Sequence, residues 1–190
     1  AFIKNVEEIL KSTNMLKEFS TQAKLMGSAF EFIVTAKSET RGEELLNECI
    51  REVQRIENLL TEFNSSSETS RINMNAGIGS VSVTDETYGL VARSINISKL
   101  TSGAFDITAG SLKKLYNFKN TDAVIPKKEI IREALAKTGY EKIKLQPPSS
   151  VFLAKAGMHV SFGAIGKGYA ADKVKSMMQE KGVEAGVINA

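Results

Sequence analysis

Apolar residues recur every three or four positions over residues 39–63, which predicts the longest helix of the chain. The apolar positions are Leu45, Leu46, Cys49, Val53, Ile56, Leu59, Leu60 and Phe63. They share one helical face because an α-helix turns once per 3.6 residues. Shorter helices are expected at 84–101, 111–116, 127–138 and 165–181. Thr84 would cap one of them at its start, and Gly103, Gly139 and Gly182 would end three of them.

Short runs of Phe, Ile, Val and Thr predict strands between these helices. One strand is expected over 25–36, and others at 81–83, 142–145, 151–154 and 158–162. A last strand begins at Val187 and is cut short, so we expect further residues in the parent protein. The interspersed helices and strands predict an α+β fold.

The two ends of this pattern suggest a simple domain division. Ile3, Val6 and Leu10 have helical spacing, which predicts a short amphipathic helix or a partner-dependent arm over residues 1–19. We therefore expect an arm at 1–22 and one domain at 23–190, incomplete at its C-terminus. The tract 64–73 is poor in apolar residues and is expected to lie outside the core.

Composition excludes several classes of protein. The net charge is only +3, and basic residues are mixed with acidic ones, so no nucleic-acid-binding surface is expected. No apolar run approaches the roughly 18 residues that span a bilayer. The single Cys49 lies on an apolar helical face, where a buried, inert thiol is a better interpretation than a catalytic one.

The segment 163–172 (GAIGKGYAAD) offers the clearest candidate chemistry, because glycines at a helix start let backbone N–H groups approach a phosphate. Lys167 would add a full positive charge there. The segment matches neither the Walker pattern nor the Rossmann pattern. A helix cap with tight packing accounts for the glycines about equally well.

Two other candidates also have plain structural interpretations. Phe105 and Asp106 lie between glycines, which suits a ligand pocket, yet Asp106 could simply cap the next helix. His159 is the only histidine, and neither a nucleophile motif nor a metal-ligand pattern accompanies it. A catalytic triad or a metal site at His159 is therefore given little weight.

Four segments in order resemble the motifs of the ApbE family, the FAD:protein FMN transferases. They are MGSAF at 26–30, SETSRIN at 67–73, GAFDITAG at 103–110 and GAIGKGYAAD at 163–172. The resemblance implies an α+β, T-fold-like architecture, with mixed or antiparallel sheets packed against helices. It also implies FAD as substrate, Mg²⁺, and transfer of FMN to a Thr or Ser hydroxyl of a target protein with release of AMP.

Carried over position by position, the resemblance assigns roles but no catalytic residue. The residues expected to contact FAD are Met26, Phe63, Ala104, Phe105, Asp106, Ser161 and Lys167. The Ala164 carbonyl would bind the metal, whose side-chain ligands would lie beyond Ala190. Phe63 and Ser161 stand where the family usually has Tyr and Asp. This chain alone is therefore expected to have an incomplete cation site and to be inactive.

Two alternative functions stay open, the first because of the departures at Phe63 and Ser161 and the second because water could replace the acceptor hydroxyl. The alternatives are an FAD-binding protein without transferase activity, and a Mg²⁺-dependent FAD pyrophosphatase that gives FMN and AMP. The resemblance further implies an acceptor that is a subunit of a membrane redox complex. It suggests the extracytoplasmic face of the cell membrane, with association through a lipid anchor missing from this chain, and the cytoplasm as the alternative.

Overall fold

The computed structural model describes residues 15–116 and 125–190 and divides the chain into two compact units. The first unit comprises Ala1–Glu57 and Ile165–Ala190, and the second comprises Asn58–Ala164. Each unit has its own three-stranded sheet. The boundary expected at residue 22 falls inside the first strand.

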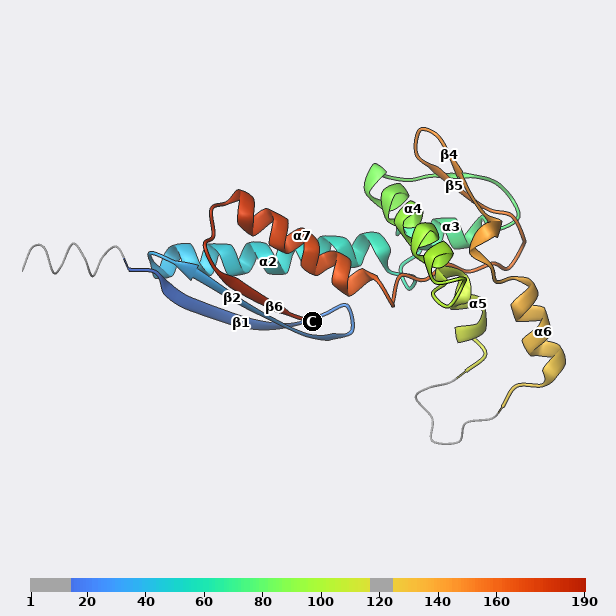
Figure 1. Cartoon of the computed structure of the whole chain (residues 1–190), viewed down its shortest axis with the longest axis horizontal. Helices are drawn as coiled ribbons and strands as arrows, with labels where there is room; N and C mark the ends of the chain where they lie inside the picture. The colour runs from blue at the N-terminus through green and yellow to red at the C-terminus, as the bar shows by residue number, and fades with distance from the viewer. Residues whose placement is uncertain (1–14, 117–124) are drawn as a thin grey trace, which may run out of the picture. The chain divides into compact units, whose positions relative to one another are not determined.

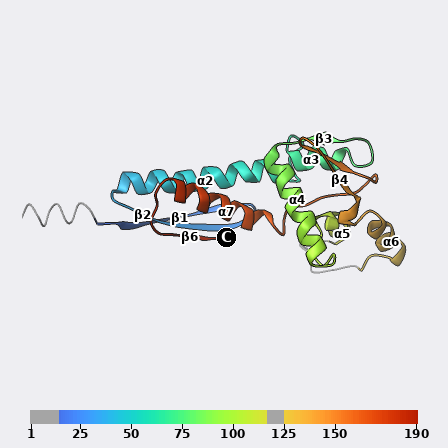
Figure 2. The same ribbon diagram turned by 45° about the horizontal axis from the view of Figure 1, so that its top comes forward.

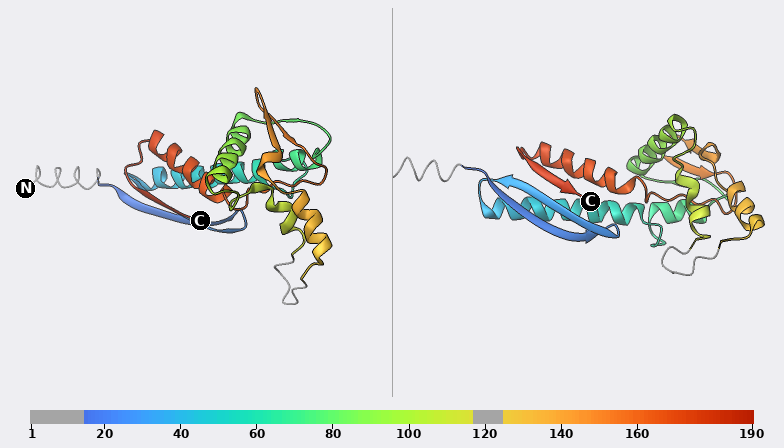
Figure 3. Two further views of the ribbon diagram at one scale, coloured as in Figure 1. Left: turned by 45° about the vertical axis from the view of Figure 1, so that its right-hand side comes forward. Right: turned by 60° about the horizontal axis from the view of Figure 1, so that its bottom comes forward.

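A β-hairpin supplies two of the three strands in the sheet of the first unit. Strands β1 (Lys17–Leu25) and β2 (Ser28–Ala36) pair antiparallel, and β6 (Gly186–Asn189) pairs with the other edge of β2 (Figure 3). The strand expected over 25–36 is confirmed from Ser28 onward, as β2, but the start of the range is a turn, because Met26 and Gly27, at φ 50° and 79°, reverse the chain. Such a two-residue turn matches the twist of a hairpin.

The same hairpin corrects the prediction for the N-terminal residues. Residues 17–19 are extended in β1, where alternate side chains point to opposite faces, and are therefore not helical. Residues 1–14 of the expected helix lie outside the described residues.

Two helices, α2 (Glu39–Leu60) and α7 (Gly166–Glu180), lie along one face of this sheet (Figures 1 and 2). Alternate residues of β2, among them Phe30, Phe32 and Val34, are buried, as expected of a strand with one covered face. Helix α2 confirms the longest predicted helix. Its Cys49 is 1% exposed, and burial raises the pKa of this thiol to about 11, which confirms the buried, inert interpretation.

The second unit combines short helices with a small antiparallel sheet of order β3-β5-β4. Its strands are β3 (Val81–Ser82), β4 (Ile143–Gln146) and β5 (Ser150–Leu153). Its helices are α3 (Glu68–Met74), α4 (Asp85–Leu100), α5 (Gly110–Lys113) and α6 (Lys128–Ala136), with 3₁₀ turns η1 (Ile107–Ala109) and η2 (Tyr140–Lys142). The Thr84 hydroxyl accepts from the Thr87 N–H, confirming the predicted cap of α4.

Two predictions for the second unit are wrong. The polar tract 64–73 contains much of helix α3, and Thr69 and Ile72 are almost fully buried. The segment 158–162 is buried but is not a strand. The Asn73 side chain, rather than a neighbouring strand, bonds both backbone groups of Val160. Within the described residues, no helix is both long and apolar enough to cross a membrane.

Candidate functional site

The residues expected to contact FAD and the metal lie in both units. Met26 occupies the hairpin turn of the first unit, and Lys167 lies in the first turn of α7. The other expected residues belong to the second unit: Phe63, Ala104, Phe105, Asp106, Ser161 and Ala164.

The segment 67–73 organises the second unit. Ser67 caps α3 by accepting from the Ser70 N–H, and the Glu68 carboxylate accepts from the Thr84 N–H at 2.8 Å and from the Thr84 hydroxyl at 2.9 Å. The Asn73 amide donates to the Val160 carbonyl at 2.9 Å and accepts from the Val160 N–H at 2.7 Å. These bonds tie α3 to the start of α4 and to segment 158–162.

Asp106 caps the 3₁₀ turn η1 and also reaches η2. Its Oδ1 accepts from the Thr108 N–H at 2.8 Å and from the Thr108 hydroxyl at 2.7 Å, while Oδ2 accepts from the Tyr140 N–H at 2.9 Å. The capping interpretation is confirmed. Because both carboxylate oxygens already accept hydrogen bonds, a nucleotide contact by Asp106 would add to a structural role. That contact stays a prediction.

Ser161 lies next to the segment that carries Asp106. Its backbone N–H donates to the Ile107 carbonyl at 2.9 Å, and its hydroxyl accepts from the Gly163 N–H at 3.5 Å. The fold therefore brings Ser161 close to the 103–110 segment, in which Phe105 is half-buried and Ala104 is exposed. The expected contacts of these residues with FAD stay predictions.

The start of α7 has the features of an anion-binding helix terminus. Its N-cap residue, Ile165, makes no side-chain capping bond. A Cβ added at Gly168 would meet no described atom within 4 Å, and one at Gly163 would meet only the Ser161 hydroxyl at 3.7 Å. Tight packing therefore does not explain these two glycines. N–H groups without a side-chain cap, beside the half-buried Lys167, are chemically suited to a phosphate.

Sequence reasoning missed a charged cluster around His159. The Glu62 carboxylate lies 2.6 Å from His159 Nε2 through Oε2 and 2.9 Å from Lys113 Nζ through Oε1. The cluster borders a pocket of about 410 Å³ that Phe63 and Lys114 also line. Glu62 and His159 are 97 positions apart, so no local pattern could have paired them.

Burial governs the protonation of this pair. Desolvation lowers the pKa of His159, and nearby Lys114 and Lys113 lower it further against the opposing effect of Glu62. Desolvation would raise the pKa of Glu62, but hydrogen bonds from His159 and Lys113 outweigh it and the pKa lies below its usual value. A neutral imidazole that donates its Nε2–H to an ionised carboxylate follows from these shifts.

The described residues do not by themselves complete a metal site. They contain no group of three or more His, Cys, Asp or Glu side chains that could hold a metal ion. A backbone carbonyl such as that of Ala164 would need further oxygen ligands to bind Mg²⁺.

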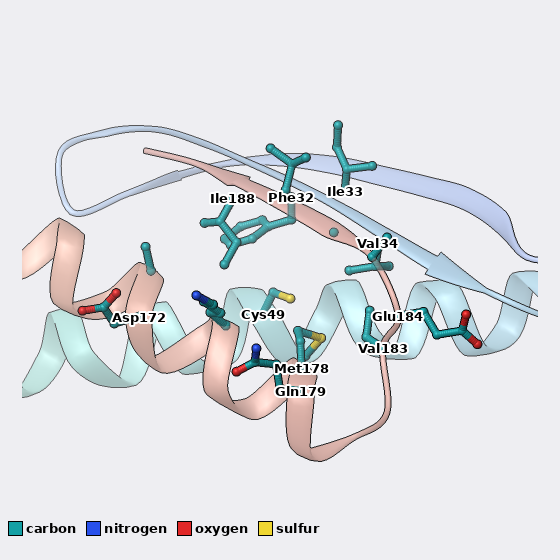
Figure 4. Close-up of a pocket in the computed structure, with 15 residues that line it drawn as sticks. Phe32, Ile33, Val34, Cys49, Asp172, Met178, Gln179, Val183, Glu184 and Ile188 are labelled. Atoms are coloured by element: carbon teal, nitrogen blue, oxygen red, sulfur yellow. The ribbon is translucent and has the colours of Figure 1, made fainter.

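A second cavity, of about 500 Å³, lies in the first unit between the sheet and the two helices (Figure 4). Phe32, Val34 and Ile188 point from the strands toward Cys49 and Met178, while Ile33 points to the opposite face of the sheet. None of the expected FAD contacts lines this cavity.

Comparison with known proteins supports the resemblance in the four motifs. The model of the ApbE family matches residues 26–190. An FAD:protein FMN transferase of Klebsiella pneumoniae is 32% identical over 172 residues, covering 90% of this chain and 53% of that protein. One of Treponema pallidum is 28% identical over 150 residues, covering 76% of this chain and 41% of that protein.

Solved structures share the fold. The flavin transferase ApbE from Vibrio cholerae aligns with a TM-score of 0.84 at 23% identity, over 93% of this chain and 58% of that one. The ApbE protein from Thermotoga maritima aligns with a TM-score of 0.78 at 26% identity, over 86% and 53%. The expected α+β architecture is confirmed.

The chain spans about half the length of the curated relatives it matches. Within that span the motifs, the relatives and the fold agree, and the match runs from the hairpin turn at Met26 to the last residue of the chain. The chain therefore belongs to the ApbE family.

Proposed function

We propose that the protein containing this chain transfers FMN from FAD to a Thr or Ser hydroxyl of an acceptor protein. The observation that carries this proposal is the start of α7 in a chain of the ApbE family. A Cβ would meet nothing within 4 Å at Gly168 and only the Ser161 hydroxyl at Gly163, and Lys167 lies beside N–H groups that have no side-chain cap. Relatives that carry the name FAD:protein FMN transferase support the same reaction.

The reaction breaks the phosphoanhydride bond between the two phosphates of FAD and forms one phosphoester bond to the acceptor hydroxyl. The acceptor oxygen would attack the FMN-side phosphorus of FAD, the bond from that phosphorus to the bridging oxygen would break, and AMP would leave with that oxygen. The hydroxyl proton would pass to solvent or to a base that we do not assign. Lys167 and the N–H groups of α7 would offset the negative charge that develops on the phosphate oxygens.

The remaining expected contacts would hold the nucleotide. We propose that Met26, Phe63, Ala104, Phe105, Asp106 and Ser161 contact FAD. Phe63 is 88% exposed, so its ring is available for stacking on an aromatic ligand. Ser161 offers a hydroxyl where the family usually has a carboxylate, and one nucleotide contact would therefore be weaker.

We further propose that Mg²⁺ is required and that the Ala164 carbonyl is one of its ligands. A divalent cation would neutralise charge on the phosphates of FAD. Among the described residues, no group of three or more His, Cys, Asp or Glu side chains accompanies this carbonyl.

Two other outcomes remain as alternatives, and the residues at 63 and 161 favour the first of them. Loss of the usual Tyr hydroxyl and Asp carboxylate would suit a protein that binds FAD without transferring it. The same site with water as acceptor would be an FAD pyrophosphatase that releases FMN and AMP.

Mass spectrometry separates the three functions. The full-length protein would be incubated with FAD, Mg²⁺ and a candidate acceptor, with an EDTA-treated sample as control. We expect the acceptor to gain the mass of an FMN group while AMP appears. Free FMN with AMP would instead show pyrophosphatase activity, and unchanged FAD bound to the protein would rule out both reactions.

We propose a subunit of a membrane redox complex as the acceptor, and the extracytoplasmic face of the cell membrane as the location, through a lipid anchor outside this chain. Fractionation of cells, followed by peptide mapping of flavin-labelled proteins, tests both statements. Labelled proteins confined to the soluble cytoplasm would contradict them.

A further inference from the structure

The pair formed by Glu62 and His159 joins two segments that are far apart in sequence. Glu62 lies just after α2 ends at Leu60, and His159 lies in the buried segment 158–162. Their side chains are 13% and 11% exposed, and 2.6 Å separates Oε2 from Nε2. A charge-assisted hydrogen bond of this length, shielded from water, fixes the relative position of its two partners.

The imidazole of His159 is itself held in place. A Cβ at Gly110 would lie 2.6 Å from His159 Cδ2 and 2.7 Å from the His159 carbonyl oxygen, so only glycine permits this approach. The next residue, Val160, is held by both hydrogen bonds of the Asn73 amide. His159 is therefore tightly packed, and its hydrogen bond holds the Glu62 side chain in place.

Phe63, by contrast, has little packing of its own. Its side chain is 88% exposed, and its N–H donates to the Thr61 hydroxyl at 3.2 Å. An exposed ring takes its orientation from the backbone that carries it. The adjacent Glu62 ties this backbone to segment 158–162, while Ser67 holds it at the Thr61 carbonyl, and Phe63 and His159 line the same pocket.

We propose that His159 is a positioning residue for the nucleotide: by holding Glu62, it fixes the ring of Phe63 where the aromatic part of FAD stacks. This inference rests on the proposed function, because it takes FAD as the ligand at Phe63. It assigns His159 no contact with the reacting atoms. Lys113, the other partner of Glu62, is 54% exposed and forms an ion pair with the second oxygen of the same carboxylate.

A double-mutant cycle tests the inference, with FAD affinity of the full-length protein measured by flavin fluorescence. His159→Leu removes the donor, whereas His159→Gln keeps a neutral N–H donor. We expect His159→Leu to weaken FAD binding about tenfold, the size of losing one aromatic contact with a base, and His159→Gln to stay within about twofold of wild type. Glu129→Gln, on the exposed face of α6, is the charge-matched control for Glu62→Gln.

The combination with Phe63→Ala gives the decisive result. If His159 acts through Phe63, the double variant Phe63→Ala/His159→Leu binds FAD no more weakly than Phe63→Ala alone. Losses that add would overturn the inference, because they would show a separate contact or a general structural defect. Thermal unfolding of each variant monitors folding, and Glu62→Gln replaces His159→Leu in the cycle if the latter does not fold.

The failure of this inference differs from that of the proposed function. Wild-type protein that binds FAD, with His159→Leu and Glu62→Gln binding it equally well, would overturn the positioning role alone. Wild-type protein that does not bind FAD at all would overturn both.

Discussion

At the scale of single residues, Glu62 and His159 make the folded protein sensitive to acid. The pKa of His159 lies below 6.5 in the folded chain, so the unfolded chain binds more protons as the pH falls through that value. The pKa of Glu62 lies below 4.5, which acts in the same direction at lower pH. Stability from His159 is fully present above about pH 6.5 and is lost as the pH falls through the folded pKa.

His159→Gln should therefore flatten the pH profile of stability. Wild-type protein is expected to lose stability between pH 7.5 and roughly pH 5, whereas the variant cannot protonate at this position and should lose less over the same range. Chemical denaturation at several pH values measures the difference. Parallel profiles for the two proteins would show that His159 does not titrate as described.

At the scale of elements, the glycine in the first turn of α7 lowers the stability of the helix but leaves its backbone accessible to a ligand. Gly168 lies in the first turn of the helix, and nothing described lies within 4 Å of a Cβ placed there. Alanine has the higher helix propensity, so Gly168→Ala should raise the free energy of unfolding by about 0.5–1 kcal/mol. If a phosphate approaches this backbone, the same change should weaken FAD binding.

Gly89→Ala provides the matched control for this prediction. Gly89 lies inside α4, and a Cβ there also meets nothing within 4 Å. We expect Gly89→Ala to stabilise the protein by a similar amount without changing its FAD affinity. Thermal unfolding and FAD titration of both variants make the comparison, and equal affinities for both would argue against a phosphate at α7.

The elements that the sequence predicts well are those whose pattern is local. The apolar face of α2 and the cap at Thr84 each depend on residues a few positions apart in sequence, and both are confirmed. The hairpin turn at Met26 was missed because methionine rarely adopts positive φ. The burial of residues 67–70 and of Ile72 was missed because the tract is held in place by long-range bonds: Glu68 bonds Thr84, 16 positions away, and Asn73 bonds Val160, 87 positions away.

At the scale of the whole molecule, the two units differ in how the chain builds them. The second is continuous in sequence, from Asn58 to Ala164, whereas the first combines two separate segments. We predict that a fragment of residues 58–164 folds by itself, because its core residues, such as Leu90, Val151 and Val160, are buried in a continuous stretch of chain. Cooperative thermal unfolding followed by circular dichroism tests this, and a gradual, featureless melt would contradict it.

Separation along the chain limits what the sequence could predict about the site. Four motifs in order were enough to identify the family, because each motif is a short continuous segment of the sequence. They did not reveal that Asp106 holds η2 or that His159 meets Glu62, because these contacts join residues 34 and 97 positions apart. A sequence motif shows which residues are present, but the fold determines which of them are in contact.

The segment 158–162 should be recognisable by hydrogen exchange. The Val160 N–H donates to the Asn73 side chain and the Ser161 N–H donates to the Ile107 carbonyl, although neither residue belongs to a strand. Both amides should exchange with deuterium as slowly as those of a regular sheet. Asn73→Ala would let the Val160 amide exchange quickly and leave the Ser161 amide protected. The Asn73 side chain thus makes the backbone hydrogen bonds that a neighbouring strand makes in a sheet.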